Sequence, residues 1–236
     1  MKNFSQEQGI VLVDRLILAI QENKQYLSDI DGAIGDGDHG INMNKGFTLC
    51  REALDKQSGN LSYGLKTLGK ILMMKIGGSM GPLYGKFFMA IGKTLEDKES
   101  IGKNEFLAAL KAALTDIQAI SPAKVGDKTL MDVLIPSVET MENAVNEGAS
   151  FEESLDRMSA AAEAGRDSTI DMVAKIGRSS RLGERSRGVM DAGSASCCLI
   201  LTTMATSIKE MLFKNTSLGA FSLLHSTYLS KILSAT

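Results

Sequence analysis

The chain has 236 residues, of which 44% are hydrophobic and 23% charged, and its formal net charge at pH 7 is −2. This length and composition suit a soluble globular protein with a substantial core, and the near-neutral charge gives no electrostatic case for nucleic-acid binding. Three cysteines, two of them adjacent at Cys197 and Cys198, fit neither a disulfide framework nor a zinc site. They are expected in the core of a protein in a reducing compartment.

Helical periodicity dominates the chain from its N-terminus onward, and no convincing alternating strand pattern occurs. The first apolar run predicts a helix from Ser5 to Leu27, in which Ser5 and Gln8 resemble a capping box. Further helices are expected, in chain order, from about residue 38 to beyond residue 54 and over about 61–74, 81–95, 104–119, 130–146, 150–175 and 194–213, with a last amphipathic piece at 218–232. The predicted fold class is all-α, with a single domain.

No targeting or membrane segment is predicted. Asp14 and Arg15 interrupt the first apolar run, which therefore lacks the layout of a signal peptide. No apolar stretch looks long enough to span a bilayer, so we expect a cytoplasmic protein without membrane contact.

The stretch GDGDHG, residues 35–40, has the glycine spacing of a dinucleotide-binding fingerprint, but a helical pattern precedes it where that fingerprint needs a strand. Its variable positions include Asp36 and Asp38, and Asp31 lies five residues before the first of them. Carboxylates repel a polyphosphate unless a cation lies between, and Mg²⁺ is commonly held by carboxylates together with phosphate oxygens. The pattern predicts a nucleotide held through metal, with a solvated acidic turn as the alternative.

Two other loops have the properties of a phosphate site. GGSMG, residues 77–81, precedes Pro82 and a predicted helix start, where backbone N–H groups can meet a phosphate. GRSSRLGERSRG, residues 177–188, places four arginines around one loop, and arginine suits phosphate oxygens. Taken singly, these are also compatible with an interhelical turn and a solvated basic face. Together with the acidic loop they predict phosphoryl transfer.

Four blocks of the sequence resemble the nucleotide-binding L subunit of bacterial dihydroxyacetone kinases: DGAIGDGDHGINMNKGF, IGGSMGPLYGKFF, VGDKTLMDVLIPSVE and GRSSRLGERSRGVMDAGS. The resemblance extends from about residue 5 to about residue 212. It implies an antiparallel eight-helix barrel with the nucleotide held by loops at one end. On this reading residues 1–213 form the L-type domain, and residues 214–236 are a C-terminal extension of unknown role.

The resemblance also implies site residues. Asp31, Asp36 and Asp38 would ligate two Mg²⁺ ions that bridge the phosphates of ADP or ATP. His39 is a possible phosphate contact, and no residue is expected to act as a nucleophile. The full set implied to line the nucleotide site is His39, Gly40, Ile41, Asn42, Gly78, Ser79, Met80, Ser121, Leu130, Arg178, Asp191, Ala192 and Gly193. Ala192 stands where the family commonly has proline, and the Ser79-Met80 pair differs from the small residues usual there.

Such L subunits work with a K subunit that holds dihydroxyacetone. In the phosphotransferase-system type, a phosphohistidine on an M subunit rephosphorylates the bound ADP in place, and this is the function implied for the chain. One alternative is a two-subunit ATP-dependent kinase of dihydroxyacetone or another short ketose, with exchangeable nucleotide. Another is non-enzymatic, with the ADP-loaded chain acting as a co-regulator of a transcription factor.

Overall fold

The computed structural model describes the backbone of residues 2–233 and the side chains of residues 2–215. Regular structure in this part of the chain is almost entirely helical, which confirms the predicted all-α class. The elements in order are β1 (Phe4–Ser5), α1 (Gln6–Glu22), α2 (Lys24–Ile34), α3 (His39–Lys56), α4 (Leu61–Lys75), α5 (Met80–Leu95), β2 (Ser100–Ile101), α6 (Lys103–Gln118), α7 (Met131–Asn146), α8 (Phe151–Ser168), the 3₁₀ segments η1 (Thr169–Asp171) and η2 (Ser179–Ser186), and α9 (Ala192–Leu233).

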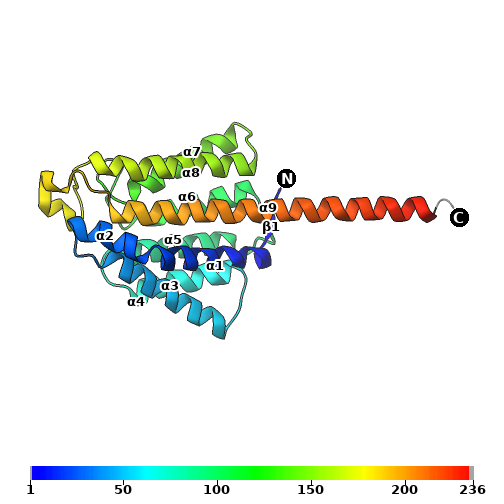
Figure 1. Ribbon diagram of the computed structural model, residues 1–236, viewed down its shortest axis with the longest axis horizontal. Helices are drawn as coiled ribbons and strands as arrows, with labels where there is room; N and C mark the ends of the chain where they lie inside the picture. The colour runs from blue at the N-terminus through cyan, green and yellow to red at the C-terminus, as the bar shows by residue number, and fades with distance from the viewer. Residues whose placement is uncertain (1, 234–236) are drawn as a thin grey trace.

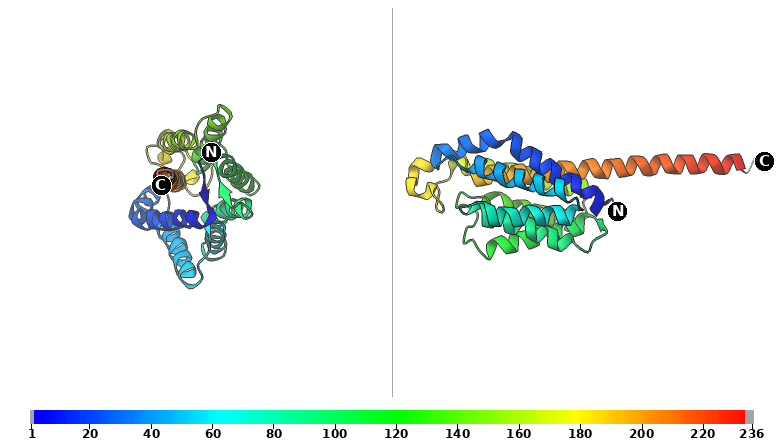
Figure 2. Two further views of the ribbon diagram at one scale, coloured as in Figure 1. Left: turned by 90° about the vertical axis from the view of Figure 1, so that its right-hand side faces the viewer. Right: turned by 90° about the horizontal axis from the view of Figure 1, so that it is seen from below.

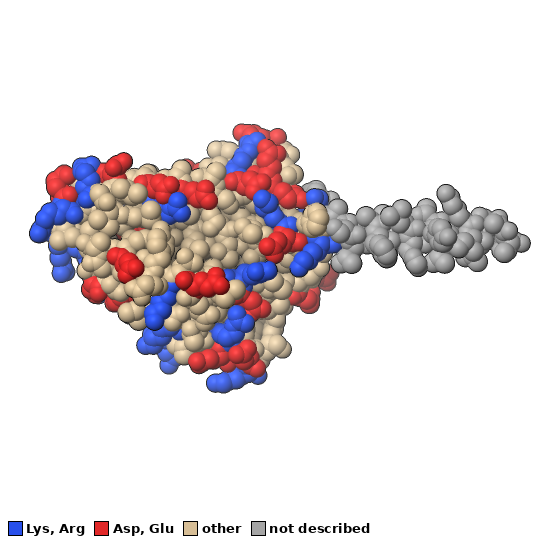
Figure 3. Space-filling model, in the orientation of Figure 1, with Lys and Arg blue, Asp and Glu red and all other residues tan. Residues whose placement is uncertain are grey.

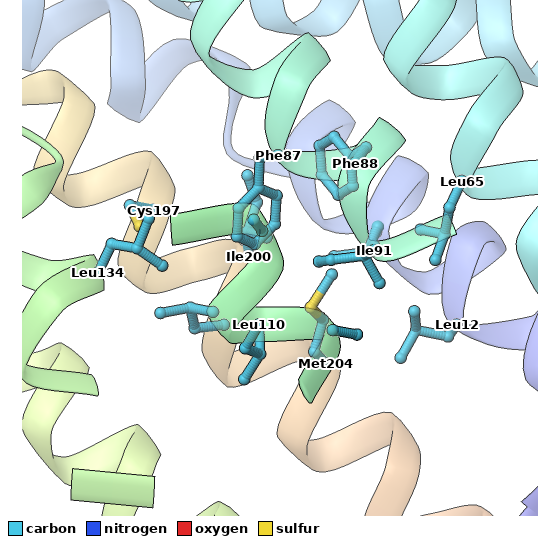
Figure 4. Packing of buried hydrophobic residues seen from close by; sticks show 14 of the residues in the cluster. Leu12, Leu65, Phe87, Phe88, Ile91, Leu110, Leu134, Cys197, Ile200 and Met204 are labelled. Carbon is cyan, nitrogen blue, oxygen red and sulfur yellow. The ribbon is translucent and has the colours of Figure 1, made fainter. Parts of the chain in front are cut away.

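The helices form a ring around a shared core. From α3 to α9 each helix packs on the next along the chain, and α1 packs on α9 and closes the ring (Figures 1 and 2). Helical periodicity places apolar side chains on the inner face of each helix, where burial stabilises the bundle. Figure 4 shows Phe88, Ile91 and Met204 from two different helices meeting in this interior. Acidic and basic side chains are interspersed over the surface in Figure 3, as the small net charge would suggest.

The first expected helix is in fact two helices. The Ser5–Gln8 capping box is present, but α1 ends at Glu22 and α2 begins at Lys24. At the junction, the side-chain amide of Asn23 donates to the carbonyl of Ala19 at 2.9 Å and ends the first helix. Asparagine side chains compete for backbone hydrogen bonds in this way. Because the apolar pattern continues through the buried Leu27, periodicity alone does not reveal the break.

Two short strands were not expected from the sequence. β1 and β2 pair antiparallel, with Phe4 opposite Ile101 and Ser5 opposite Ser100. Each strand has only two residues, which is too short for an alternating pattern to appear. Phe4 and Ile101 are both buried, so the pair closes the end of the bundle where α1 and α6 begin.

One other expected helix limit changes. α8 ends at Ser168 instead of near Lys175, and η1 follows directly. Pro136 lies inside α7, where it has no N–H to donate to the carbonyl four residues earlier, at Asp132. Gly165 of α8 packs against that same carbonyl, which a Cβ at this position would overlap.

Helix α9 is longer and more apolar than expected. Its segment Ala192–Asn215 has a mean hydropathy of 1.3 and is long enough to cross a membrane, contrary to the prediction that no stretch is. However, 61% of an apolar 18-residue window within it is buried inside the protein, where Cys197 and Ile200 face the other helices (Figure 4). Such burial is typical of a core helix. The backbone of α9 runs without interruption past residue 213, while the side chains of the amphipathic piece expected at 218–232 lie outside the described residues.

Candidate functional site

Loops from four parts of the chain meet at one end of the bundle and enclose a cavity of about 240 Å³. Figure 1 shows α2 and the yellow segment before α9 together at this end. Most of the residues implied by the sequence resemblance line the cavity: Asp31, Asp36, Asp38, His39, Asn42, Gly78, Ser79, Met80, Ser121, Leu130, Arg178, Asp191, Ala192 and Gly193. The fold therefore brings together segments that are more than 150 residues apart in the sequence.

Gly40 and Ile41 are not among the residues lining the cavity. Ile41 is 52% exposed in the first turn of α3. Gly40 lies where α3 packs on α2, and a Cβ there would overlap the carbonyl of Lys24 and approach the Ser28 hydroxyl oxygen to 2.6 Å. In this structure the glycine permits close helix packing, a role that the sequence motif did not suggest.

Three carboxylates form an aspartate cluster at the mouth of the cavity. Asp31 lies in the last turn of α2, Asp36 in the following loop, and Asp38 immediately before α3. One carboxylate oxygen from each lies within 4.8 Å of the others. The backbone between them is tight: a Cβ at Gly35 would lie 2.5 Å from Asp31 Oδ1, and Gly37 has a φ of +73°.

The aspartate cluster fits a divalent cation. Three carboxylates this close repel one another unless a positive charge lies among them, and hard oxygen donors are the ligands that Mg²⁺ prefers. Arg178, which also lines the cavity, forms an ion pair with Asp36. The Asp31 carboxylate also accepts a hydrogen bond from the backbone N–H of His39 at 3.3 Å, which ties the cluster to the start of α3.

His39 belongs to a buried hydrogen-bond network that the sequence did not reveal. Its Nε2 lies 2.8 Å from the Ser196 hydroxyl, which in turn lies 2.6 Å from the Tyr84 hydroxyl. Tyr84 also donates to the carbonyl of Gly193 at 3.1 Å. Burial lowers the pKa of His39 to about 4, so the imidazole is neutral at pH 7. The network fixes the ring orientation of His39 beside the cavity through residues of α5 and α9.

A second polar group, which includes Asp191 and Lys128, forms part of the cavity wall. Burial raises the pKa of Asp191 to about 7, although the carboxylate accepts a hydrogen bond from Ser194 N–H at 2.7 Å. Thr169 accepts from the backbone N–H of Asp191 at 3.1 Å, and Lys128 is fully buried nearby. Sequence reasoning included Asp191 but missed Lys128 and Thr169. The only available signal for Lys128 was its position in the VGDKT block.

Comparison with known proteins identifies the family. Residues 33–206 match the DAK2 domain, and this is most of the chain. The chain belongs to the DAK2 domain family. Several DAK2-domain relatives share more than a third of their residues with it over nearly their full length. The ADP-binding subunit DhaL of PEP-dependent dihydroxyacetone kinase 2 from Listeria innocua is 38% identical over 205 residues, covering 86% of this chain and 94% of the relative. The corresponding subunit from Escherichia coli is 36% identical over 190 residues, covering 79% and 89%.

The DAK2 domain also occurs within longer proteins. A D-erythrulose kinase from Mycolicibacterium smegmatis is 33% identical over 199 residues, which are only 34% of its length. The crystal structure of the dihydroxyacetone kinase of C. freundii in complex with AMP-PNP and Mg²⁺ matches 83% of this chain and 33% of its own, with a TM-score of 0.63 and 23% identity. At that identity the likeness supports the all-α DAK2 fold and not a particular ligand.

Proposed function

We propose that this DAK2-domain chain is the ADP- and Mg²⁺-binding subunit of a dihydroxyacetone kinase. It would relay a phosphoryl group from a phosphohistidine carrier, through bound ADP and ATP, to dihydroxyacetone held on a K subunit. The observation that carries the proposal is the aspartate cluster at the mouth of a cavity that Arg178 also lines, with Arg178 paired to Asp36. The relatives from L. innocua and E. coli, named as ADP-binding subunits, align with the chain over most of their length.

Each loop has a distinct task in this proposal. The aspartate cluster would hold two Mg²⁺ ions. When bound, these ions would offset the negative charge of the phosphates. Ser79 and Met80 lie on the cavity wall where α5 begins, so backbone N–H groups at that helix start can meet a phosphate. Arg178 would neutralise further phosphate charge. The chain thus positions a nucleotide and offsets its charge, and it needs no nucleophile of its own.

The cavity also has an apolar side suited to a nucleobase. Leu83 of α5, Ile117 of α6 and the Leu130–Met131 pair at the start of α7 line it together with Ala123. A flat aromatic base gains from burial against aliphatic side chains, whereas the phosphates need the charged side near α2. In the proposal, ADP would therefore lie with its phosphates at the aspartate cluster and its base between α5, α6 and α7.

We further propose that exposed apolar side chains in segments leading into the site form a docking surface for the K subunit. Met74 is 66% exposed at the end of α4, and Val125 is 49% exposed in the loop before α7. Large exposed apolar patches often indicate protein interaction sites. We define the apolar rim as Ile41, Met73, Met74, Ile120 and Val125, all in segments that lead into the site.

The substitution Met74→Glu should weaken transfer to a K subunit without changing ADP retention. A charge at the apolar rim would be desolvated on docking, so we expect roughly a tenfold higher half-saturating K-subunit concentration, equivalent to about 1.4 kcal/mol. Val11→Glu is the matched control, because Val11 is also exposed but lies on α1, near the opposite end of the bundle. Equal effects of both substitutions on transfer would argue against docking at the rim.

The nucleotide content of the purified protein tests the function itself. The protein is purified without added nucleotide and denatured in acid, and released nucleotide is quantified by chromatography. Near one ADP per chain supports a retained cofactor and the phosphotransferase-linked relay. In this version of the proposal an M subunit is a further partner, and the relay operates in the cytoplasm. An empty protein that turns over added ATP with a K subunit and dihydroxyacetone would instead establish an exchanging, ATP-dependent kinase. An empty protein that is inactive under those conditions would refute both versions.

A further inference from the structure

A buried ammonium group bonds to both ends of the segment that carries Arg178. Residues 172–189 connect η1 to the start of α9, and we call them the arginine loop. Nζ of Lys128 donates to the carbonyl of Thr169 at 2.7 Å, to that of Met172 at 3.1 Å and to that of Val189 at 2.6 Å. Two of these acceptors lie at the entry to the loop and one at its exit. The Lys128 side chain therefore joins the two chain segments at the base of the loop, which we call its neck.

The bonding of Lys128 is complete. An ammonium group carries three N–H donors, and all three are used on backbone carbonyls. Burying a charged group is costly unless polar partners replace water, and the carbonyls do so here. The backbone of Lys128 has a φ of +62°, the one positive value at a non-glycine residue in the described chain. Such a backbone persists only where surrounding interactions hold it.

Other hydrogen bonds also hold the loop: Ala174 N–H donates to the Ser186 hydroxyl at 2.9 Å, and Lys175 N–H donates to the carbonyl of Asp127 at 3.2 Å. Gly188 N–H donates to the carbonyl of Ile170 at 2.8 Å, beside the bonds of Lys128. Beyond the neck, Arg178 extends to the cavity and pairs with Asp36 of the aspartate cluster. The arginine that faces the proposed phosphates is thus placed by a loop whose base is fixed and whose distal part is exposed.

We propose that Lys128 is a positioning residue for the nucleotide site. By joining the two chain segments at the base of the arginine loop, it holds the loop so that Arg178 stays beside the aspartate cluster. A loop that is already ordered loses less conformational entropy when the nucleotide binds, which strengthens binding. The inference rests on the proposed nucleotide-binding function, but the anchoring of the loop can be measured without nucleotide.

The first test is the substitution Lys128→Met, which removes the three donors while keeping an unbranched side chain of similar length. Release of a fluorescent ADP analogue in Mg²⁺, followed by stopped flow, should become roughly 10- to 100-fold faster, the range seen when groups that support a bound metal site are lost. Lys103→Met is the matched control, because Lys103 Nζ also donates to a backbone carbonyl, that of Ala149 at 2.6 Å. Lys103 lies at the start of α6, whereas the end of α6 faces the cavity. The Lys103→Met variant should therefore release ADP at the wild-type rate.

A double-mutant cycle separates positioning from a general loss of stability. If Lys128 acts through Arg178, Lys128→Met should change ADP release little in an Arg178→Ala background. Additive effects of the two substitutions would overturn the inference. Lys128→Gln, which retains two N–H donors without charge, provides a second variant in case the methionine variant does not fold; unchanged ADP release and loop cleavage in it would also count against the anchor.

Limited trypsin digestion of the nucleotide-free protein measures directly whether Lys128 holds the arginine loop in place. Arg181 and Arg185 are exposed within the arginine loop, and cleavage there should be faster in Lys128→Met than in the wild type. Equal cleavage rates would refute the anchoring. A wild-type protein that binds no ADP would instead refute the proposed function, while this comparison of cleavage rates would still decide whether Lys128 fixes the loop.

Discussion

The substitution Asp36→Asn is expected to release ADP and Mg²⁺ together. The change keeps the size of the side chain but removes one of three carboxylates whose oxygens lie within 4.8 Å. It also removes the charged partner of Arg178. Loss of an outer-shell group at metal sites costs 10- to 100-fold in affinity, so loss of a direct ligand should weaken ADP binding by roughly 100-fold or more. Isothermal titration with ADP, at several Mg²⁺ concentrations, measures this change.

The control for this prediction is Asp29→Asn. Asp29 is an exposed residue of α2, the helix that also carries Asp31, and its carboxylate accepts a hydrogen bond from Gln25 at 2.7 Å instead of joining the cluster. Its removal should leave ADP affinity and the response to Mg²⁺ unchanged. Arg178→Ala shows how much of the loss comes from the ion pair, because that variant keeps all three carboxylates. Full retention of ADP and Mg²⁺ by Asp36→Asn after extensive dialysis would refute the metal assignment.

The substitution Gly40→Ala should destabilise the protein and disturb the metal loop at the same time. The added methyl group would overlap the Lys24 carbonyl and lie 2.8 Å from the backbone nitrogen of Ser28, so α2 and α3 must move apart. Overpacking of this kind costs about 1–3 kcal/mol. Because α2 carries Asp31 and α3 follows Asp38, the shift should also lower ADP affinity. Urea unfolding and ADP titration measure the two effects.

Gly32→Ala is the matched substitution within α2. A Cβ at Gly32 would meet the Cα of Gly37 at 3.8 Å, an ordinary contact distance. Alanine has a higher helix propensity than glycine, so this variant should be unchanged or up to about 1 kcal/mol more stable. If Gly40→Ala were as stable as Gly32→Ala and bound ADP normally, the close packing of α2 on α3 would not be what requires glycine at residue 40.

Most helices could be predicted because their determinants are local. Inward-facing apolar residues recur every three or four positions, and polar groups at helix ends satisfy free N–H groups within a few residues. The capping box at Ser5 and the Ser150 hydroxyl, which accepts from Glu153 N–H at 3.1 Å, both follow this rule. The break at Asn23 could not be predicted, since its side chain interrupts the helix while the apolar pattern continues to Leu27.

The residues that support the site through hydrogen bonds could not be predicted from the sequence. Tyr84, Ser196 and His39 belong to three different helices, and their hydrogen bonds form only when α3, α5 and α9 are side by side. The three carbonyls that surround Lys128 Nζ belong to residues 41 to 61 positions away along the chain. A buried lysine that bonds only to backbone carbonyls leaves no side-chain pattern by which to recognise its partners.

The sequence by itself determined the all-α class, most of the helices and the loops that carry carboxylates, glycines and arginines, because helix formation and turn chemistry depend on neighbours a few residues apart. Only the tertiary structure decided that the aspartate cluster faces Arg178, that Gly40 serves helix packing, and that Lys128 anchors the arginine loop. These features depend on distances between segments far apart in the chain. Such distances are set when the apolar faces of the helices close around a common core.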